Sequence, residues 1–337
     1  MTPRRRTMRS IAAVAALAAL SAPAWAQERP TLTVYTYDSF VTDYGPGPVI
    51  EERFEAECGC DLDLVAAGDG AQLLARLRLE GENTEADVVL GLDTNLIAAA
   101  KDTGLFAEHG IAPPADLAVP GGWSDETFLP YDWGWFAFVY DETRLAEPPT
   151  SFEALRAAPE DVTIVIQDPR TSTPGLGLLL WVKHVYGDEA EAAWADLAPR
   201  IVTVTKGWWE AYSAFLESEA AMALSYTTSP AYHAIAEGDD TKKAAAFDEG
   251  HYLQIEVAGK LASTDAPALA DAFLAFMLTE PFQSAIPTTN WMYPAVGPAP
   301  EGFDDLIEPE TSLRFPPEQV PAVRDAALAE WLDALSR

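Results

Sequence analysis

The chain has 337 residues, with 21 Lys or Arg against 53 Asp or Glu, so its formal net charge at pH 7 is −32. A surface this acidic repels nucleic acid and anionic membranes, and it attracts cations. With 49% hydrophobic residues, the chain has the composition of a folded protein rather than of a disordered acidic one. We therefore expect no nucleic-acid partner.

The N-terminus has the layout of a secretory signal peptide. An arginine-rich segment (4–9) precedes an apolar run (11–20) that is too short to span a membrane, and Ala-Trp-Ala at 24–26 is a typical cleavage site. We expect residues 1–26 to be removed and the mature protein to be periplasmic, not membrane-embedded. The 311 residues that remain are enough for about two domains.

The two cysteines, Cys58 and Cys60, stand in a CGC sequence. In an oxidising compartment a disulfide between them is the first expectation. The pair has too few ligands for a structural zinc site, and the four histidines are scattered without metal-ligand spacing. We expect neither a metal nor a cofactor.

The first part of the chain alternates strand and helix patterns. Strands are predicted at 31–36, 62–66 and 86–90. Helices are predicted at 49–57, 71–79 and 95–101. Such alternation predicts an α/β fold with a mostly parallel sheet and helices on both faces.

A long aromatic strand predicted at 131–140 ends before Pro148-Pro149, where we expect the chain to enter a second lobe. Further strands are predicted at 163–166, 201–205 and 221–225. Further helices are predicted at 151–156, 176–186, 210–217, 269–278 and 322–336. The strand predicted at 251–258 is interpreted as the return crossing. This predicts lobe I from residues 27–138 plus 257–337, and lobe II from residues 139–256.

Hydroxyl and aromatic residues gather where these strands end, which is where such sheets bind ligands. Ser172 and Thr173 precede a helix, so they predict either an anion site or an ordinary helix cap. Asp69 supplies either a countercharge or the start of an Asp-Gly turn. The aromatic side chains, which stack on rings and attract flat cations, are Tyr37, Tyr44, Trp208, Trp209, Tyr226, Tyr232, Trp291 and Tyr293. Together they predict a ligand with a flat cationic ring and an anionic or hydroxyl end.

Longer runs give the sequence a family resemblance. LTVYTYDSF, ADVVLGLD, QDPRTSTPGLGLLLW, VTVTKGW, LSYTTSPAYH and AIPTTNWMYP resemble the thiamine-binding periplasmic proteins of bacterial ABC importers, over essentially the whole mature chain. The resemblance implies a type II periplasmic binding fold with two lobes, each a mostly parallel sheet flanked by helices, and two hinge crossings. It also implies thiamine, thiamine monophosphate or thiamine diphosphate as ligand, and an ABC permease with its ATPase as partner.

The resemblance further implies which residues contact the ligand. They are Asp69, Gly70, Ser172, Thr173, Trp208, Tyr226, Thr227, Thr228 and Ser229, with Tyr37, Tyr232 and Trp291 close by. No catalytic residue is implied.

Two other functions remain open on a similar fold. A thiaminase-like enzyme needs a cysteine nucleophile, but Cys58 and Cys60 lie between a helix and a strand start and are expected to be paired. A ferric-ion binder needs tyrosine ligands, but Tyr226 and Tyr232 are six residues apart rather than adjacent. We expect a binding protein and not an enzyme.

Overall fold

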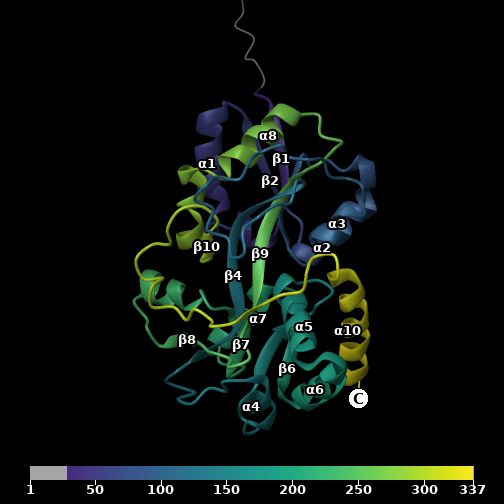
Figure 1. Ribbon diagram of the computed structural model, residues 1–337. Helices are drawn as coiled ribbons and strands as arrows, with labels where there is room; N and C mark the ends of the chain where they lie inside the picture. The colour runs from purple at the N-terminus through teal and green to yellow at the C-terminus, as the bar shows by residue number, and fades with distance from the viewer. Residues whose placement is uncertain (1–28, 337) are drawn as a thin grey trace, which may run out of the picture.

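The structure is a computed structural model, and it describes residues 29–336 (Figure 1). The predicted signal peptide and its cleavage site lie outside the described residues. Within that range, none of the helices combines the length and the apolar character of a membrane span.

Lobe I, the upper half of Figure 1, is built on three parallel strands. They are β1 (Thr31–Thr36), β2 (Asp61–Ala66) and β3 (Val88–Asp93), with β1 in the middle. The helical segments of this lobe are η1 (Asp38–Val41), α1 (Gly47–Cys58), α2 (Gly70–Glu80), η2 (Gly81–Asn83), α3 (Ile97–Lys101), α8 (Pro267–Phe276), α9 (Glu280–Gln283) and η6 (Ile286–Asn290). The strands and helices predicted for residues 31–101 and 269–278 are all present; β1 has the predicted ends, and the others have shifted ends.

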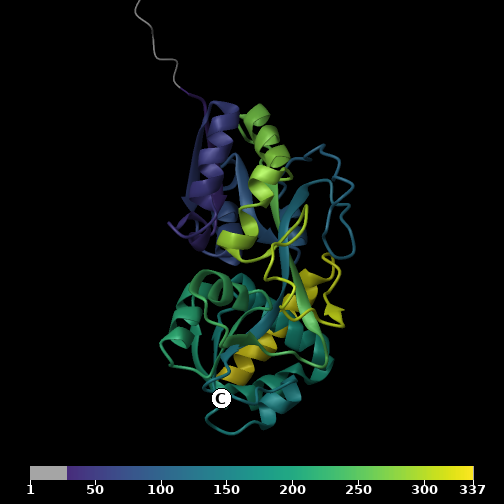
Figure 2. The ribbon, with the colours of Figure 1, turned by 90° about the vertical axis from the view of Figure 1, so that its left-hand side faces the viewer.

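Two long antiparallel strands connect the lobes (Figure 2). They are β4 (Phe128–Asp141) and β9 (His251–Lys260), which pair from Phe128 opposite Gly259 to Trp135 opposite Leu253. They lie at the centre of the strand order β2-β1-β3-β9-β4-β7-β5-β6, so one continuous ladder of strands runs through both lobes. The two predicted crossings are therefore present and extend beyond their predicted ends.

Lobe II repeats the strand–helix pattern in the lower half of Figure 1. Its strands are β5 (Ile164–Gln167), β6 (Ile201–Thr205), β7 (Met222–Tyr226) and β8 (Lys242–Ala244); β5 pairs in parallel with β6 and β7. Its helical segments are α4 (Phe152–Ala157), α5 (Thr173–Tyr186), η3 (Gly187–Glu189), α6 (Ala190–Leu197), η4 (Ala198–Arg200), α7 (Trp208–Leu216) and η5 (Tyr232–Glu237).

Helix α5 lies directly on the sheet, and this sets the position of its N-terminal residues. Its first ten residues are all buried. A Cβ at Gly177 would overlap the ring of Phe136 on β4, so the absence of a side chain lets helix and strand come this close. Deeper in the lobe, Trp181 packs on Phe152 and Phe247.

The C-terminal helix α10 (Val320–Leu335) packs against α5 and α6 of lobe II (Figure 1). Before it, the short strands β10 (Tyr293–Pro294) and β11 (Ser312–Leu313) pair with β4 and β9, so the chain passes between the lobes a third time. Lys183 of α5 and Glu330 of α10 form an ion pair at 2.7 Å. Helix α10, which the sequence analysis places in lobe I, therefore packs on helices of lobe II, and its Trp331 is buried.

Cys58 and Cys60 form a disulfide with a Cα–Cα distance of 5.2 Å, as predicted. It closes the turn between α1 and β2. Both cysteines of the chain are thus paired.

Candidate functional site

A cavity of about 420 Å³ is lined by both lobes and by the hinge strand β9. Its volume is in the range of pockets that bind small organic molecules. The side chains from lobe I are Tyr37, Ser39, Tyr44, Asp69, Thr288, Thr289, Asn290, Trp291 and Met292. Those from lobe II are Pro174, Trp208, Trp209, Tyr212, Leu216, Tyr226, Ser229 and Tyr232, and β9 adds Glu256. Within the part of the chain that the structure describes, no residue of this lining is basic, so the cavity favours a cationic or neutral ligand.

Trp208 forms part of the lobe II wall in a fixed orientation. Its ring stacks on Tyr212 with centroids 5.1 Å apart, and its Nε1 donates a hydrogen bond to Ser225 Oγ at 2.8 Å. Trp208 begins α7, whereas the sequence pattern predicted a loop here and a helix starting only at residue 210. The helix extends to it because Gly207 provides the extended N-cap.

Aromatic rings also meet across the cavity from opposite lobes. Tyr232 of lobe II contacts Trp291 of lobe I edge to face, with centroids 5.4 Å apart. Tyr44 of lobe I and Trp209 of lobe II make a second contact between the lobes, with centroids 5.4 Å apart and the rings tilted by 33°. Both contacts would break if the lobes moved apart, so they belong to a closed arrangement.

Tyr232 and Trp291 occupy unusual backbone. Tyr232 begins the π-helical segment η5, and Trp291 follows the π-helical segment η6. Trp291 has φ of 56°, in the left-handed region that side-chain-bearing residues rarely adopt. π-helical turns and strained residues concentrate at functional sites, which supports both residues as part of one.

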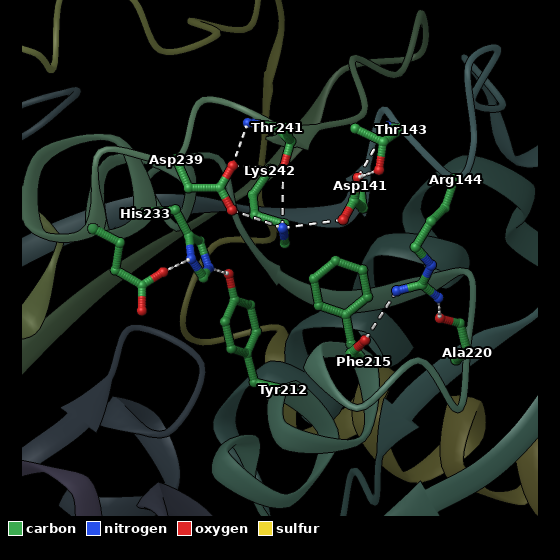
Figure 3. Close-up of polar contacts among 11 residues, drawn as sticks. Asp141, Thr143, Arg144, Tyr212, Phe215, Ala220, His233, Asp239, Thr241 and Lys242 are labelled. Atoms are coloured by element: carbon green, nitrogen blue, oxygen red, sulfur yellow. Dashed lines mark hydrogen bonds and ion pairs between the residues drawn. The ribbon is translucent and has the colours of Figure 1, made fainter.

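A buried histidine supports this wall from behind (Figure 3). His233 shares hydrogen bonds with Tyr212 Oη at 2.9 Å and with Glu237 Oε2 at 2.7 Å, and Tyr232 Oη donates to Glu237 Oε1 at 3.0 Å. One carboxylate therefore orients Tyr232 directly and Tyr212 through His233.

His233, Glu237 and Asp239 lie close enough to hold a metal ion, but other groups already bind them. The Nζ atom of Lys242 lies 3.0 Å from Asp239 Oδ2 and 3.0 Å from Asp141 Oδ2 (Figure 3). An ammonium group in this position opposes a second cation. The geometry therefore favours a hydrogen-bonded and ion-paired network that stabilises the fold at His233, Glu237 and Asp239, rather than a metal site.

The hydroxyl end of the predicted site is where the first turns of α2 and α5 meet. Asp69 caps α2, accepting from Gly70 N at 2.9 Å, and its Oδ2 accepts from Ser172 Oγ of lobe II at 2.8 Å. A Cβ at Gly70 would overlap Thr173 Oγ1, and that oxygen is buried with no hydrogen-bond partner among the described residues. Asp69 thus combines the turn role predicted as its alternative with a contact between the lobes.

The segment after β7 divides between the cavity wall and the layer behind it. Ser229 lines the cavity, with its Oγ 2.7 Å from Ser225 Oγ. Thr227 is fully buried and its N–H donates to Trp135 O at 2.9 Å. Thr228 is also buried, with its Oγ1 3.7 Å from Met292 Sδ.

The predicted contact residues therefore fall into two layers. Those on the cavity wall are Tyr37, Asp69, Trp208, Tyr226, Ser229, Tyr232 and Trp291. Those behind the wall are Gly70, Ser172, Thr173, Thr227 and Thr228. Their contact with a ligand stays a prediction.

The sequence reasoning missed the acidic floor of the cavity. Glu256 on β9 receives hydrogen bonds on Oε2 from Tyr37 Oη at 3.1 Å and from Tyr131 Oη at 2.8 Å. Asp132, opposite it on β4, accepts from Asn290 Nδ2 at 2.7 Å. Burial raises the pKa of Glu256 to about 7, and burial together with Glu256 raises that of Asp132 well above its usual range. The sequence did contain a signal for Glu256. A carboxylate inside an otherwise apolar strand costs free energy to bury, so its presence indicates a functional site.

Two αβ lobes on hinge strands, with a small-molecule cavity between them, define the class of solute-binding proteins that close around a ligand. In agreement, residues 83–319 match the family described as bacterial extracellular solute-binding protein. The iron-bound protein HitA from Pseudomonas aeruginosa has this fold, with a TM-score of 0.72 at 21% identity, covering 90% of this chain and 99% of that one. The expected fold class is confirmed.

Relatives of higher sequence identity show which family of solute-binding proteins the chain belongs to. The thiamine-binding periplasmic protein of Escherichia coli (strain K12) is 56% identical over 318 residues, which are 94% of this chain and 96% of that protein. A solved structure of a periplasmic thiamin binding protein is also 56% identical, with a TM-score of 0.90, over 92% of this chain and 97% of that one. The chain belongs to the family of thiamine-binding periplasmic proteins.

Proposed function

We propose that this protein captures thiamine between its lobes in the periplasm and delivers it to an ABC permease powered by an ATPase. The observation that carries the proposal is an aromatic cavity with acidic groups and no basic group in its lining. Thiamine has a permanently cationic thiazolium ring and a flat pyrimidine ring, and both suit such walls. The proposal includes residues 1–26 as a cleaved signal peptide.

In this proposal the rings lie among Trp208, Tyr232, Trp291 and Tyr37, and the hydroxyethyl or phosphate end lies near the facing starts of α2 and α5. The amides and hydroxyls of a helix start suit that end, so thiamine monophosphate and diphosphate are included as ligands. Bending of β4 and β9 opens and closes the lobes around the ligand.

A ferric-ion function on the same fold is less consistent with this cavity. Ferric binding through tyrosine needs the phenolate form. Burial, followed by nearby carboxylates, raises the pKa of both Tyr37 and Tyr226 well above the usual value, which opposes that form.

We also propose that no bond of thiamine is made or broken. A thiaminase-like reaction through cysteine needs a free thiol at the ligand, whereas Cys58 and Cys60 are paired and outside the cavity lining. Recovery of intact thiamine after incubation with the protein and a nucleophilic amine is the expected result. Loss of thiamine would contradict it.

The direct test is a thiamine titration of ligand-stripped, refolded protein, followed by tryptophan fluorescence and calorimetry. We expect saturable binding of one thiamine per chain at submicromolar concentration. Absence of binding, in protein shown to be folded, would overturn the proposal and make ferric iron the next ligand to test.

Replacing Asp69 with asparagine is expected to weaken thiamine binding about fivefold, with a smaller effect on a neutral pyrimidine analogue. Asparagine caps a helix as well as aspartate does, so the turn is kept while one charge is lost. A charge interaction at about 4 Å in water-like surroundings contributes about 1 kcal/mol. Calorimetry with both ligands measures the difference. Equal losses would show that Asp69 acts only through the turn and through Ser172.

A further inference from the structure

Three acidic residues form a row across the hinge. Glu256 of β9 is paired in register with Asp132 of β4 on one side and with Asp93 of β3 on the other. Asp93 and Asp132 are fully buried, and Glu256 is only 6% exposed. Like charges directly opposite one another destabilise a sheet, so the row needs a compensating function.

Neutral donors, rather than basic side chains, surround this row. Glu256 accepts from Tyr37, Tyr131 and, on Oε1, from Gln254 Nε2 at 2.9 Å. Asp93 accepts from Asn95 N at 3.1 Å and from Asn95 Nδ2 at 2.7 Å. Across residues 29–336, no hydrogen bond or ion pair joins any of the three carboxyl groups to Lys, Arg or His.

The two members of the hinge pair differ in their hydrogen bonds. Glu256 has three neutral donors and lines the cavity, whereas Asp132 accepts from Asn290 and shares a side-chain hydrogen bond with Glu256 that favours the protonated form of Asp132 and the charged form of Glu256. Donors stabilise the charged form of a carboxyl group, so Glu256 is the member prepared to be a carboxylate. Asp132 is the member better suited to keep a proton.

We propose that Glu256 is the countercharge for the cationic ring: in the empty site Glu256 holds a proton, which is released when the cation binds, while Asp132 keeps its own proton throughout. This rests on the proposed function. A buried carboxylate beside a second buried carboxyl group and without a basic partner is costly to keep charged, so a proton neutralises Glu256 when the cavity has no cation. The positive ring of the ligand replaces that proton.

Among the described residues, no basic group faces Glu256 that would supply the positive charge instead. The titratable groups that face it from neighbouring elements are Tyr37 before η1, Asp69 at the start of α2, Asp93 on β3, Tyr131 and Asp132 on β4, and Tyr226 at the end of β7. All are neutral or negative. A cationic ligand is therefore the nearest source of compensation.

The sign of the pH dependence follows from the pKa of Glu256, which burial raises to about 7 in the empty site. Below that pH the empty site holds the proton, and binding must displace it, so affinity rises with pH. Above it Glu256 has already lost its proton and affinity levels off. For one proton and a pKa of about 7, the dissociation constant of thiamine should fall about 25-fold between about pH 5.5 and 7.5.

The test measures proton release and affinity together. Thiamine is titrated calorimetrically into the full mature protein in buffers of different ionisation enthalpy, between about pH 5.5 and 8. We expect nearly one proton released per thiamine near pH 6 and almost none near pH 8. A neutral pyrimidine analogue should release none.

Glu256→Gln isolates the group responsible. This variant should bind thiamine more weakly at pH 8 and should lose most of the pH dependence, because glutamine does not titrate. Any proton that thiamine itself exchanges remains in the variant, so the difference from the wild type belongs to Glu256. Glu52→Gln, which removes an exposed charge on α1, is the matched control and should behave as wild type.

The outcomes separate the two proposals. Tight thiamine binding with no proton release and a constant affinity across this pH range would overturn the proton exchange while leaving the proposed function in place. No thiamine binding at any pH would overturn both. The wild-type measurement decides the question even if Glu256→Gln fails to fold.

Discussion

Replacing Trp208 with alanine is expected to weaken thiamine binding by more than about tenfold. Stacking and cation–π interactions at a desolvated indole together reach about 2 kcal/mol. The wild-type ring of Trp208 is held by Tyr212 and by the hydrogen bond to Ser225 Oγ, so this side chain loses little conformational entropy when the ligand binds. Fluorescence or calorimetric titration gives the ratio of dissociation constants.

The matched control for Trp208 is Trp123→Ala. Trp123 is also half-buried, and its Nε1 also makes one hydrogen bond, to Phe128 O at 2.8 Å, but it is outside the cavity lining. Its removal should leave thiamine affinity unchanged in folded protein. Unchanged affinity in Trp208→Ala itself would remove Trp208 from the site.

Replacing Gly70 with alanine is expected to weaken thiamine binding about tenfold or more by preventing full closure. The added Cβ would overlap Thr173 Oγ1 of lobe II and would lie 3.0 Å from Gly91 O. Overpacking of this kind destabilises a structure by about 1–3 kcal/mol. The overlap with Thr173 exists only when the lobes are closed, so the substitution destabilises the closed form more than the open form. Small-angle scattering with saturating thiamine should show a more extended molecule than the wild type.

A second substitution checks this interpretation. Thr173→Ala removes the overlapping oxygen, so the double variant Gly70→Ala/Thr173→Ala should bind thiamine more tightly than expected from the two single variants. Strict additivity would show that the substitution at Gly70 acts within lobe I alone.

The sequence by itself determined the local chemistry of this protein. Strand-like and helix-like hydrophobic patterns predicted the strands and helices of both lobes, because the spacing of apolar side chains follows directly from backbone geometry. The two cysteines, separated only by Gly59, predicted their own disulfide, since two residues so close in the chain need no tertiary contact to meet. Aromatic and hydroxyl residues next to strand ends predicted the cavity wall, because strand ends converge in any such sheet.

Strand register decided what local patterns could not. Glu256 and Asp132 are more than a hundred positions apart, and only the pairing of β9 with β4 makes them one acidic floor. Local pattern also could not show that Thr227 and Thr228 lie behind the cavity wall. Both are buried, whereas their sequence neighbours Tyr226 and Ser229 line the cavity.

Packing between distant segments decided the remaining features. The sequence pattern predicts α10 as a helix, but it does not show which lobe the helix packs against. In the structure its apolar face packs on α5 and α6 of lobe II. The contacts of Gly70 with Thr173 and of Tyr232 with Trp291 likewise exist only once the lobes face each other. A local pattern can show that a residue suits a ligand, whereas its position against the other lobe depends on long-range contacts that the tertiary fold alone creates.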